Sequence, residues 1–315
     1  MSTPARPFRF GLGPAGLTAG TAGEWRRMAR KFEDLGYHAI CFGDHLDSRP
    51  APGVAAVAVA LWTSELRVAT HVYCNDFRHP GLLAKEVATV AMMTEGRFDA
   101  GIGAGWMKAD YDRAGIAFDP PSERIERLRQ AVRLVKDSWT ETSVSASGPA
   151  YSLSGFPGRR SLGGAPRPAL VMGGGGRRML ALAAQEADIV SINVKLAAGV
   201  LGPDRGSSAT EASVRAKVAT VKEAAGARLN DLVLQIEAHF VAVTDDRSGG
   251  SERAAETVGL DPGEARKSPH VLIGSVGEIC EGLQRVREDF GISYICMSGA
   301  HAEELAPVVA RLAGS

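Results

Sequence analysis

Short apolar runs typical of β-strands alternate with helix-like segments along almost the whole 315-residue chain. Such alternation is typical of parallel α/β folds, because parallel strands are joined by crossover connections that are usually helices. Eight runs fit strands, at residues 8–13, 38–43, 66–74, 98–103, 169–174, 188–193, 232–243 and 292–298. Eight strands with helices between them predict a (β/α)8 barrel, with residues 1–315 forming a single domain.

Start signals support the helices between these strands. Thr21 and Glu24 form a capping-box pattern, and Ser275 and Glu278 repeat it near the C-terminus. Three stretches interrupt the alternation and are expected to be excursions between strands, at about 141–168, 195–213 and 245–269. The first is rich in Gly, Ser and Pro, and the second is long enough to suggest a lid or binding role.

Charge and composition narrow the possible partners. The 36 basic and 36 acidic residues give no net field that would recruit nucleic acid or an anionic membrane, so a small-molecule substrate is expected. We find no apolar run long enough for a signal peptide or a bilayer span, and we expect a cytoplasmic protein. The four cysteines lack CxxC spacing and are expected to be buried thiols, and the seven histidines lack ligand spacing, so no metal site is predicted.

Polar residues gather where the predicted strands end, which is where a barrel places its active site. His45 is a candidate for proton transfer or for contact with a reacting ring, because histidine titrates near neutrality. Asp44 before it either accepts hydrogen bonds from a ligand or caps the loop, and Trp106 is either a pocket wall or a core residue. Arg78 and His79 are expected only to open the helix that begins at Pro80. Further residues at strand ends are Cys74, Asn75, Asp76, Gly103, Asp110 and Asn193.

The stretch "PALVMGGGGRRML" places four glycines, Gly173 to Gly176, between the fifth strand and a helix. Unpaired backbone N–H groups at a helix N-terminus form a site for phosphate, and Arg177 could add a charge-assisted contact. The alternative is a tight turn that needs positive φ angles, for which one or two glycines would suffice.

Other folds and chemistries fit less well. "GLGPAG" at 11–16 matches a dinucleotide-binding pattern, but no helix opens at Gly16 and the spacing to Asp44 exceeds the usual ~20 residues. A metal-dependent barrel hydrolase would need paired histidines at the end of the first strand, where the chain has "GLGP". No nucleophile-elbow pattern is found either.

The motifs "FGDHL", "NDFRHPGLLAKEVATVAMMTEGRFDAGIGAGW", "MGGGGRRMLALAAQEADIVSIN" and "SPHVLIGSVGEICEGL" occur in an order that resembles the luciferase-like monooxygenase superfamily, most closely its F420-dependent oxidoreductases. The resemblance covers nearly the whole chain. It implies a (β/α)8 barrel, usually a homodimer, that binds coenzyme F420 or reduced flavin mononucleotide (FMN) at the strand C-termini.

The resemblance also implies roles for single residues. Asp44 and His45 would lie against the cofactor ring, and the turn from Gly173 to Gly176 would hold its phosphate. A bulge at the end of the third strand, often with a non-prolyl cis peptide, would fall by position at Cys74, Asn75 and Asp76. Trp106 stands where sugar-phosphate dehydrogenases of the superfamily carry an acidic residue, which argues against a sugar-phosphate substrate; Asp110 keeps the charge of a glutamate found in many relatives.

These observations predict an oxidoreductase that transfers a hydride between F420 and a small organic substrate, with His45 as the catalytic residue. Trp106 and Asn193 are the expected substrate contacts. One alternative is a two-component monooxygenase that uses FMN reduced by a separate reductase, and a second is a barrel that binds flavin or deazaflavin without turnover.

Overall fold

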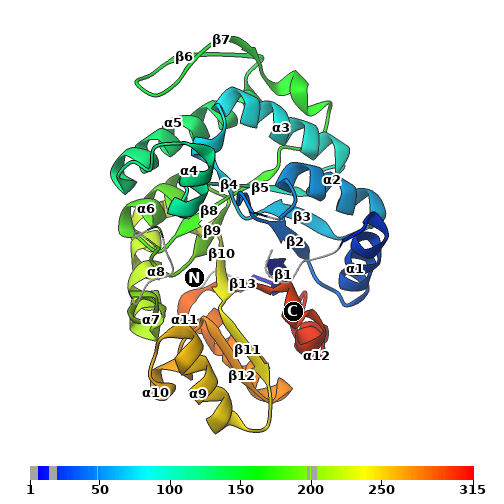
Figure 1. The fold of residues 1–315 in the computed structure, drawn as a ribbon, viewed down its shortest axis with the longest axis vertical. Coiled ribbons are helices and arrows are strands. Elements are labelled where there is room, and N and C mark those ends of the chain that lie inside the picture. Colours follow the sequence, from blue (N-terminus) through cyan, green and yellow to red (C-terminus); the bar gives the residue numbers. More distant parts are fainter. Residues whose placement is uncertain (1–5, 14–19, 48, 197–198, 200–203) are drawn as a thin grey trace. The chain divides into compact units, whose positions relative to one another are not determined.

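The computed structural model describes residues 6–13, 20–47, 49–196, 199 and 204–315. Its parallel strands make up a (β/α)8 barrel, as predicted (Figure 1). Each of the eight strands lies within a predicted run: β1 (Arg9–Gly13), β2 (Ala39–Phe42), β3 (Arg67–Thr70), β5 (Phe98–Gly103), β8 (Ala169–Gly174), β9 (Ile189–Ile192), β10 (Val233–Ala238) and β13 (Ile292–Ser298). The chain divides into two compact units, unit 1 (1–40 and 173–315) and unit 2 (41–172), with boundaries inside β2 and β8.

Unit 1 contains a run of parallel strands in the order β2, β1, β13, β10 and β9. Its helices include α1 (Ala22–Asp34), α6 (Arg177–Glu186), α8 (Glu211–Ala225), α11 (Val276–Phe290) and α12 (Ala302–Leu312). Both predicted capping boxes are confirmed, since the Thr21 hydroxyl accepts from Glu24 N–H and the Ser275 hydroxyl accepts from Glu278 N–H. The local start signals therefore place α1 and α11 correctly.

The prediction of one strand over 232–243 is wrong. The chain leaves the barrel ladder at His239, where the N–H of His239 donates to the carbonyl of His270 at 2.8 Å. Beyond that point β11 (Phe240–Val243) pairs with β12 (Val271–Gly274) in a separate two-stranded sheet. The expected excursion at 245–269 contains α9 (Arg247–Val258) and α10 (Pro262–Ala265), which flank this small sheet (Figure 1).

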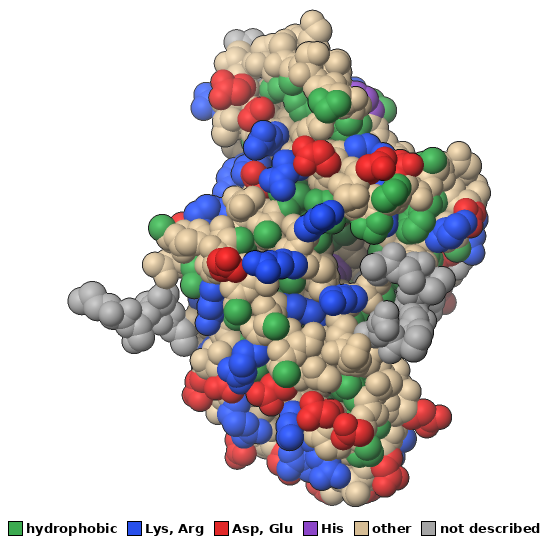
Figure 2. Space-filling model, turned by 90° about the vertical axis from the view of Figure 1, so that its left-hand side faces the viewer, with side chains coloured by type: hydrophobic (Ala, Val, Ile, Leu, Met, Phe, Trp, Pro, Cys, Tyr) green, Lys and Arg blue, Asp and Glu red, His purple; other side chains and the backbone are tan. Residues whose placement is uncertain are grey.

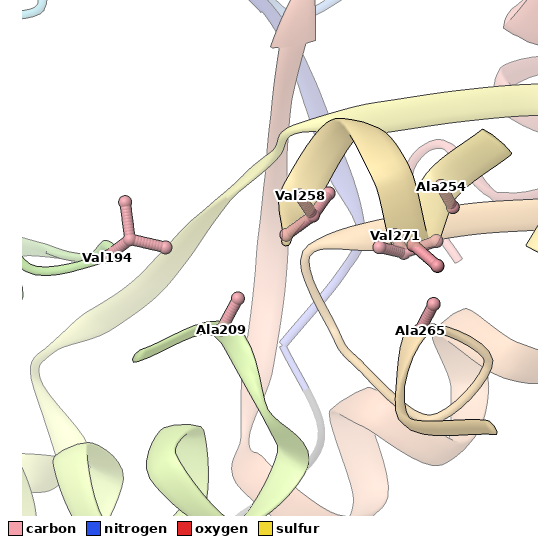
Figure 3. Close-up of a cluster of buried hydrophobic side chains, with 7 residues drawn as sticks. Val194, Ala209, Ala254, Val258, Ala265 and Val271 are labelled. Atoms are coloured by element: carbon pink, nitrogen blue, oxygen red, sulfur yellow. The ribbon is translucent and has the colours of Figure 1, made fainter. Parts of the chain in front are cut away.

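The stretch 195–213 is also more ordered than a loop, since it contains α7 (Asp204–Ala209) and the start of α8; residues 197–198 and 200–203 of it lie outside the described residues. Buried small side chains hold this region together. Val194 after β9, Ala209 of α7 and Val258 of α9 belong to one apolar cluster, labelled with its neighbours in Figure 3. Packing of Val194 in this cluster therefore fixes the backbone that follows β9.

Unit 2 holds β3, β5 and β8 in parallel pairing, with the short strand β4 (Tyr73–Cys74) beside β5. Its helices are α2 (Pro52–Trp62), α3 (Pro80–Met93), α4 (Lys108–Ala114) and α5 (Pro121–Thr140). The predicted strand 66–74 is interrupted between β3 and β4, where the peptide bond between His71 and Val72 is cis. The excursion at 141–168 contains a hairpin of β6 (Ser143–Ser147) and β7 (Ser152–Pro157), which Figure 1 shows beside α5.

Burial agrees with the expectation for the cysteines, because all four are free and buried. No helix among the described ranges is long and apolar enough to cross a membrane. Acidic and basic side chains are interspersed on the face drawn in Figure 2, in keeping with the zero formal net charge.

Candidate active site

In unit 2, Asp44 follows β2 and is held by two groups. Arg78 donates two hydrogen bonds to its carboxylate, Nη1 to Oδ2 at 2.7 Å and Nη2 to Oδ1 at 3.0 Å. The backbone N–H of Cys74 donates to Oδ2 at 2.9 Å. Because both carboxylate oxygens are engaged, Asp44 has one fixed orientation. The expectation that Arg78 only opens α3 is therefore wrong, whereas His79 does cap α3 by accepting from Gly81 N–H.

His45 forms a pair with Asp110 in the first turn of α4. Its Nδ1 lies 2.7 Å from Asp110 Oδ2, and the two side chains are 16% and 3% exposed. Asp110 also accepts hydrogen bonds from the backbone N–H of Leu46 and from the Arg113 guanidinium. These two contacts fix the carboxylate independently of its contact with the imidazole. A carboxylate at Nδ1 keeps a proton there and leaves Nε2 as the nitrogen for exchange with a ligand.

Trp106 lies half-buried beside this pair, not in the core. Its ring meets the His45 imidazole edge to face, with centroids 5.7 Å apart and an interplanar angle of 83°. This contact limits the rotation of His45. The structure therefore brings His45, Trp106 and Asp110 together.

The backbone irregularity lies three residues earlier than expected. The cis peptide and the strand break fall at His71–Val72, not at Cys74–Asp76. Val72 packs directly over Gly103, where an added Cβ would come within 2.5 Å of Val72 Cγ2. Gly103 is thus required by this close approach.

Asn75 and Asp76 follow β4 in the short 3-10 helix η1 (Asn75–Phe77), and both are tied to other parts of unit 2. Asn75 is fully buried and donates from Nδ2 to the Tyr151 hydroxyl at 2.9 Å. Asp76 accepts two hydrogen bonds from Arg127, at 3.1 and 2.9 Å, and one from the Tyr111 hydroxyl at 2.9 Å. Burial raises the pKa of the neighbouring Cys74 thiol to about 11, so this thiol stays protonated at neutral pH.

In unit 1, β8 ends in the glycine turn and α6 begins at Arg177. None of the four glycines has a positive φ, so the alternative of a positive-φ turn is wrong. Close approach explains two of them, since an added Cβ would lie 2.1 Å from Ser191 O at Gly173 and 2.3 Å from Val194 O at Gly175. Gly176 faces open space and no side chain caps α6. Among the described residues, the first N–H groups of α6 thus have neither a partner within the helix nor a side-chain cap.

Arg177 contributes less to this turn than expected. It is exposed, and its guanidinium lies 3.5 Å from Glu223 of α8. An exposed pair at this distance holds the side chain weakly. The backbone, and not the arginine, is the defined feature of the turn.

Asn193 joins a polar set that the sequence did not reveal. Its Nδ2 donates to Glu237 Oε2 at 3.2 Å, and its Oδ1 lies 3.1 Å from Nε2 of His239. His239 stacks on His270, with ring centroids 5.1 Å apart. Burial lowers the pKa of both histidines below its usual value. Glu237 and His239 follow the strand-end rule, but the predicted strand ran past them to residue 243.

Arg78, Arg127 and Tyr111 were missed for a different reason. Each contacts a predicted residue that lies 34 to 51 positions away in the chain, and no local pattern marks such a pairing. The only available signal was that buried carboxylates need a partner.

The family model for luciferase-like monooxygenases matches residues 8–274. An F420-dependent glucose-6-phosphate dehydrogenase of Kribbella flavida is 33% identical over 132 residues, which cover 39% of this chain and 39% of that protein. An FMNH(2)-dependent dimethylsulfone monooxygenase of Pseudomonas putida is 28% identical over 109 residues, 35% of this chain and 30% of that protein. The chain thus aligns with less than half the length of these curated relatives.

Among solved structures, the coenzyme F420-dependent tetrahydromethanopterin reductase of Methanopyrus kandleri superposes with a TM-score of 0.72 at 15% identity. That match covers 98% of this chain and 99% of the reductase, and it supports the same fold. With the family model matching most of its length, the chain belongs to the luciferase-like monooxygenase family.

Proposed function

We propose that the protein is an oxidoreductase that transfers a hydride between coenzyme F420 and a small organic substrate. The observation that carries this proposal is the His45–Asp110 pair, which fixes an imidazole at the end of a barrel strand in a chain similar to F420-dependent and FMNH(2)-dependent enzymes. The names of similar proteins point the same way, since the Kribbella dehydrogenase and the Methanopyrus reductase are both F420-dependent.

The glycine turn fits the phosphate of such a cofactor. Gly176 leaves open space at the N-terminus of α6, and the helix has no side-chain cap to compete with a ligand. The partial positive charge of a helix N-terminus favours an anion there. Gly175 and Gly176 would present the backbone, and Arg177 would add charge from the exposed side.

In unit 2, the side chains of the protein would orient the bound groups and move a proton. A bound deazaflavin supplies the two-electron hydride chemistry. Asp110 fixes the His45 ring through Nδ1, so Nε2 would be the nitrogen that holds or releases a proton as charge moves. Because Arg78 fixes Asp44, its carboxylate would keep one orientation during the reaction. Trp106 supplies a flat surface beside His45.

A flavin monooxygenase is the second candidate. The similarity to an FMNH(2)-dependent monooxygenase favours it, because the same turn would accept the phosphate of FMN. This function would need a separate reductase to supply reduced flavin. A barrel that binds the cofactor without turnover would show the same affinity and no reaction.

A homodimer and a cytoplasmic location stay predictions. For the dimer, the large apolar side chains of Val54 and Leu61 on α2 and Leu82 on α3 are 65–73% exposed, as surfaces that contact another protein often are. Light scattering on the purified protein measures the molar mass directly. Trp106 and Asn193 are retained as proposed substrate contacts.

A fluorescence titration of the purified protein with F420 and with FMN tests the choice of cofactor. We expect micromolar binding of F420 and weaker binding of FMN. Binding of FMN alone would overturn the F420 proposal in favour of the monooxygenase.

His45→Ala tests the proposed catalytic residue. We expect hydride transfer to or from F420 to slow by about 10²-fold or more, the usual size of a lost acid–base contribution, while F420 affinity changes by less than about threefold. Asp110→Asn keeps the shape of the pair, and we expect it to slow transfer by a smaller factor. Unchanged rates in both variants would remove the pair from the mechanism.

A further inference from the structure

Glu237 lies at the C-terminal end of β10, where barrel enzymes carry reactive groups. Its Oε1 is 3.9 Å from the position that a Cβ on Gly13 would take, although β13 separates β10 from β1 in the sheet. Side chains of alternate strands come this close on the concave face of a barrel. The carboxylate therefore sits inside the mouth of this part of the barrel, over the end of β13.

The hydrogen bonds around Asn193 fix its orientation. Its Oδ1 accepts from the backbone N–H of Val194 at 2.8 Å, so the oxygen and not the nitrogen faces that group. The nitrogen Nδ2 must then be the donor to Glu237 Oε2. Since Oδ1 can only accept, the proton between it and His239 sits on His239 Nε2.

His270 lies behind His239 and holds its ring in place. His270 is fully buried, and its Nδ1 lies 2.8 Å from the backbone carbonyl of Glu237, so this nitrogen carries a proton. The His270 ring stacks on His239 at an interplanar angle of 22°. Asn193 is thus held by its own backbone and by a stacked histidine, and it holds one oxygen of Glu237.

The other carboxylate oxygen, Oε1, has no hydrogen-bond donor among the residues that the structure describes. Among residues 6–13, 20–47, 49–196, 199 and 204–315, Glu237 has no ion pair, and no hydrogen bond to Oε1 is found. Burial is the main cause that lowers the pKa of both histidines. The Glu237 carboxylate raises the pKa of His239, His239 lowers that of His270, and Arg205 of α7 and Lys217 of α8 lower both. A half-buried carboxylate with one oxygen fixed and one open is suited to proton exchange.

We propose that Glu237 is the group that exchanges a proton with the substrate's oxygen, and that Asn193, His239 and His270 position it. This inference rests on the proposed hydride-transfer function and assigns the substrate to the alcohol–carbonyl class. In the oxidation, the carbinol C–H bond breaks and its electron pair leaves as hydride, which reduces the deazaflavin. The O–H bond breaks, its proton passes to Glu237, and the C=O bond forms; the reduction runs the same steps backwards.

Binding of 2,2,2-trifluoroethanol, followed by ¹⁹F NMR, tests the proposal with a small hydroxyl donor in place of the unidentified substrate. The titration is done on the protein with and without F420. We expect millimolar binding that weakens by about tenfold in Glu237→Gln, because a charged acceptor is replaced by a neutral one. We also expect wild-type affinity to fall as pH drops through the protonation of Glu237, and Glu237→Gln to lose this dependence.

Two further variants separate this role from a structural one. Glu252→Gln changes an exposed glutamate of α9 in the same unit and should leave probe affinity and its pH profile unchanged. Asn193→Ala removes the donor that stabilises the charged carboxylate, so the midpoint of the pH profile should move to higher pH. Should Glu237→Gln prove unstable in thermal melts, this shift still tests the proposal.

The outcomes distinguish the two proposals. Probe affinity that is absent in the wild type, or equal in wild type and Glu237→Gln, overturns the role of Glu237 whether or not F420 binds. Failure of F420 to bind, with the probe results as expected, contradicts the proposed cofactor and leaves Glu237 as the hydroxyl-binding group.

Discussion

The strand-end carboxylates of unit 2 and unit 1 are held in opposite ways. In unit 2, Asp44 meets Arg78, Asp76 meets Arg127 and Asp110 meets His45, each within 2.9 Å. In unit 1, Glu237 is held by the neutral amide of Asn193. A carboxylate that accepts two hydrogen bonds from an arginine has a fixed direction, whereas a single bond from an amide leaves the second carboxylate oxygen open. Both oxygens of Asp44, Asp76 and Asp110 are therefore engaged, whereas Glu237 keeps one oxygen without a hydrogen bond from the described residues.

The positive groups near these carboxylates also differ in what they contact. Arg78 and Arg127 of unit 2 lie against aspartates. Lys217 of unit 1 is buried on α8, and its Nζ donates to the Ser208 carbonyl at 2.5 Å and to its hydroxyl at 2.9 Å, both neutral acceptors. Among the described residues Lys217 thus has no carboxylate partner, and the buried Arg124 of unit 2 likewise donates only to backbone carbonyls, those of Ala104, Gly105 and Asp119.

Arg78→Met breaks the best-defined pair of unit 2 and should have the largest effect. The Asp44 side chain is 6% exposed, and the substitution leaves it buried without its countercharge. Loss of one partner of a buried pair costs about 3–5 kcal/mol, and we expect a loss of this size in the free energy of unfolding by urea.

Two variants serve as controls for that measurement. Arg49→Met breaks an exposed pair with Asp47 and should cost less than about 1 kcal/mol. Adding Asp44→Asn to Arg78→Met removes the uncompensated charge and should restore much of the loss. Equal losses for Arg78→Met and Arg49→Met would show that burial does not distinguish these pairs.

Gly175→Ala tests whether the glycine turn of unit 1 is shaped by packing or by a ligand. The new Cβ would lie 2.3 Å from the Val194 carbonyl oxygen, a backbone atom, so the end of β9 must move. We expect a loss of about 2–3 kcal/mol in thermal or urea unfolding, in the range of overpacked cores.

Gly176→Ala is the matched control, because nothing lies within 4 Å of its added Cβ. We expect it to cost less than about 1 kcal/mol, the size of a helix-cap effect. A large loss for Gly176→Ala would contradict open space at Gly176. No loss for Gly175→Ala would contradict a close backbone approach at Gly175.

Local patterns in the sequence were sufficient to predict the elements of the barrel. The capping boxes at Thr21 and Ser275 and the apolar runs correctly placed helices and strands because their signals lie within a few residues. The strand at 232–243 failed because hydropathy does not change where the chain exchanges partners at His239. A switch of hydrogen-bonding partner depends on residues far along the chain, here His270.

The candidate site divides in the same way. Asp44 and His45 were predicted from their position after a strand, and Asp110 from its charge, but Arg78, the partner of Asp44, and Tyr111, a partner of Asp76, were not predicted as such. Gly173 and Gly175 were predicted as part of a phosphate site, which stays a prediction, and the sequence did not reveal that the backbone of residues 191 and 194 crowds both positions. Sequence shows which residues are reactive; the pairings that set their reactivity arise only in three dimensions.

Lys217 gives the smallest expected effect and tests the contrast between its contacts and those of Arg78 and Arg127. Burial, with a smaller effect of Lys195, lowers the pKa of Lys217 from 10.5 to about 8. Between these values the unfolded chain binds more protons than the folded one, so stability should rise with pH from about 8 to about 10.5. A shift of this size corresponds to at most about 3 kcal/mol, and we expect about 2 kcal/mol after partial solvation. The measurement is the free energy of unfolding across this window for the wild type minus that for Lys217→Met, which cancels the titration of other groups. Lys222→Met, on the exposed face of the same helix, should keep the wild-type slope. Parallel curves for wild type and Lys217→Met would mean that unit 1 compensates this charge after all, and the contrast with unit 2 would then rest on Glu237 alone.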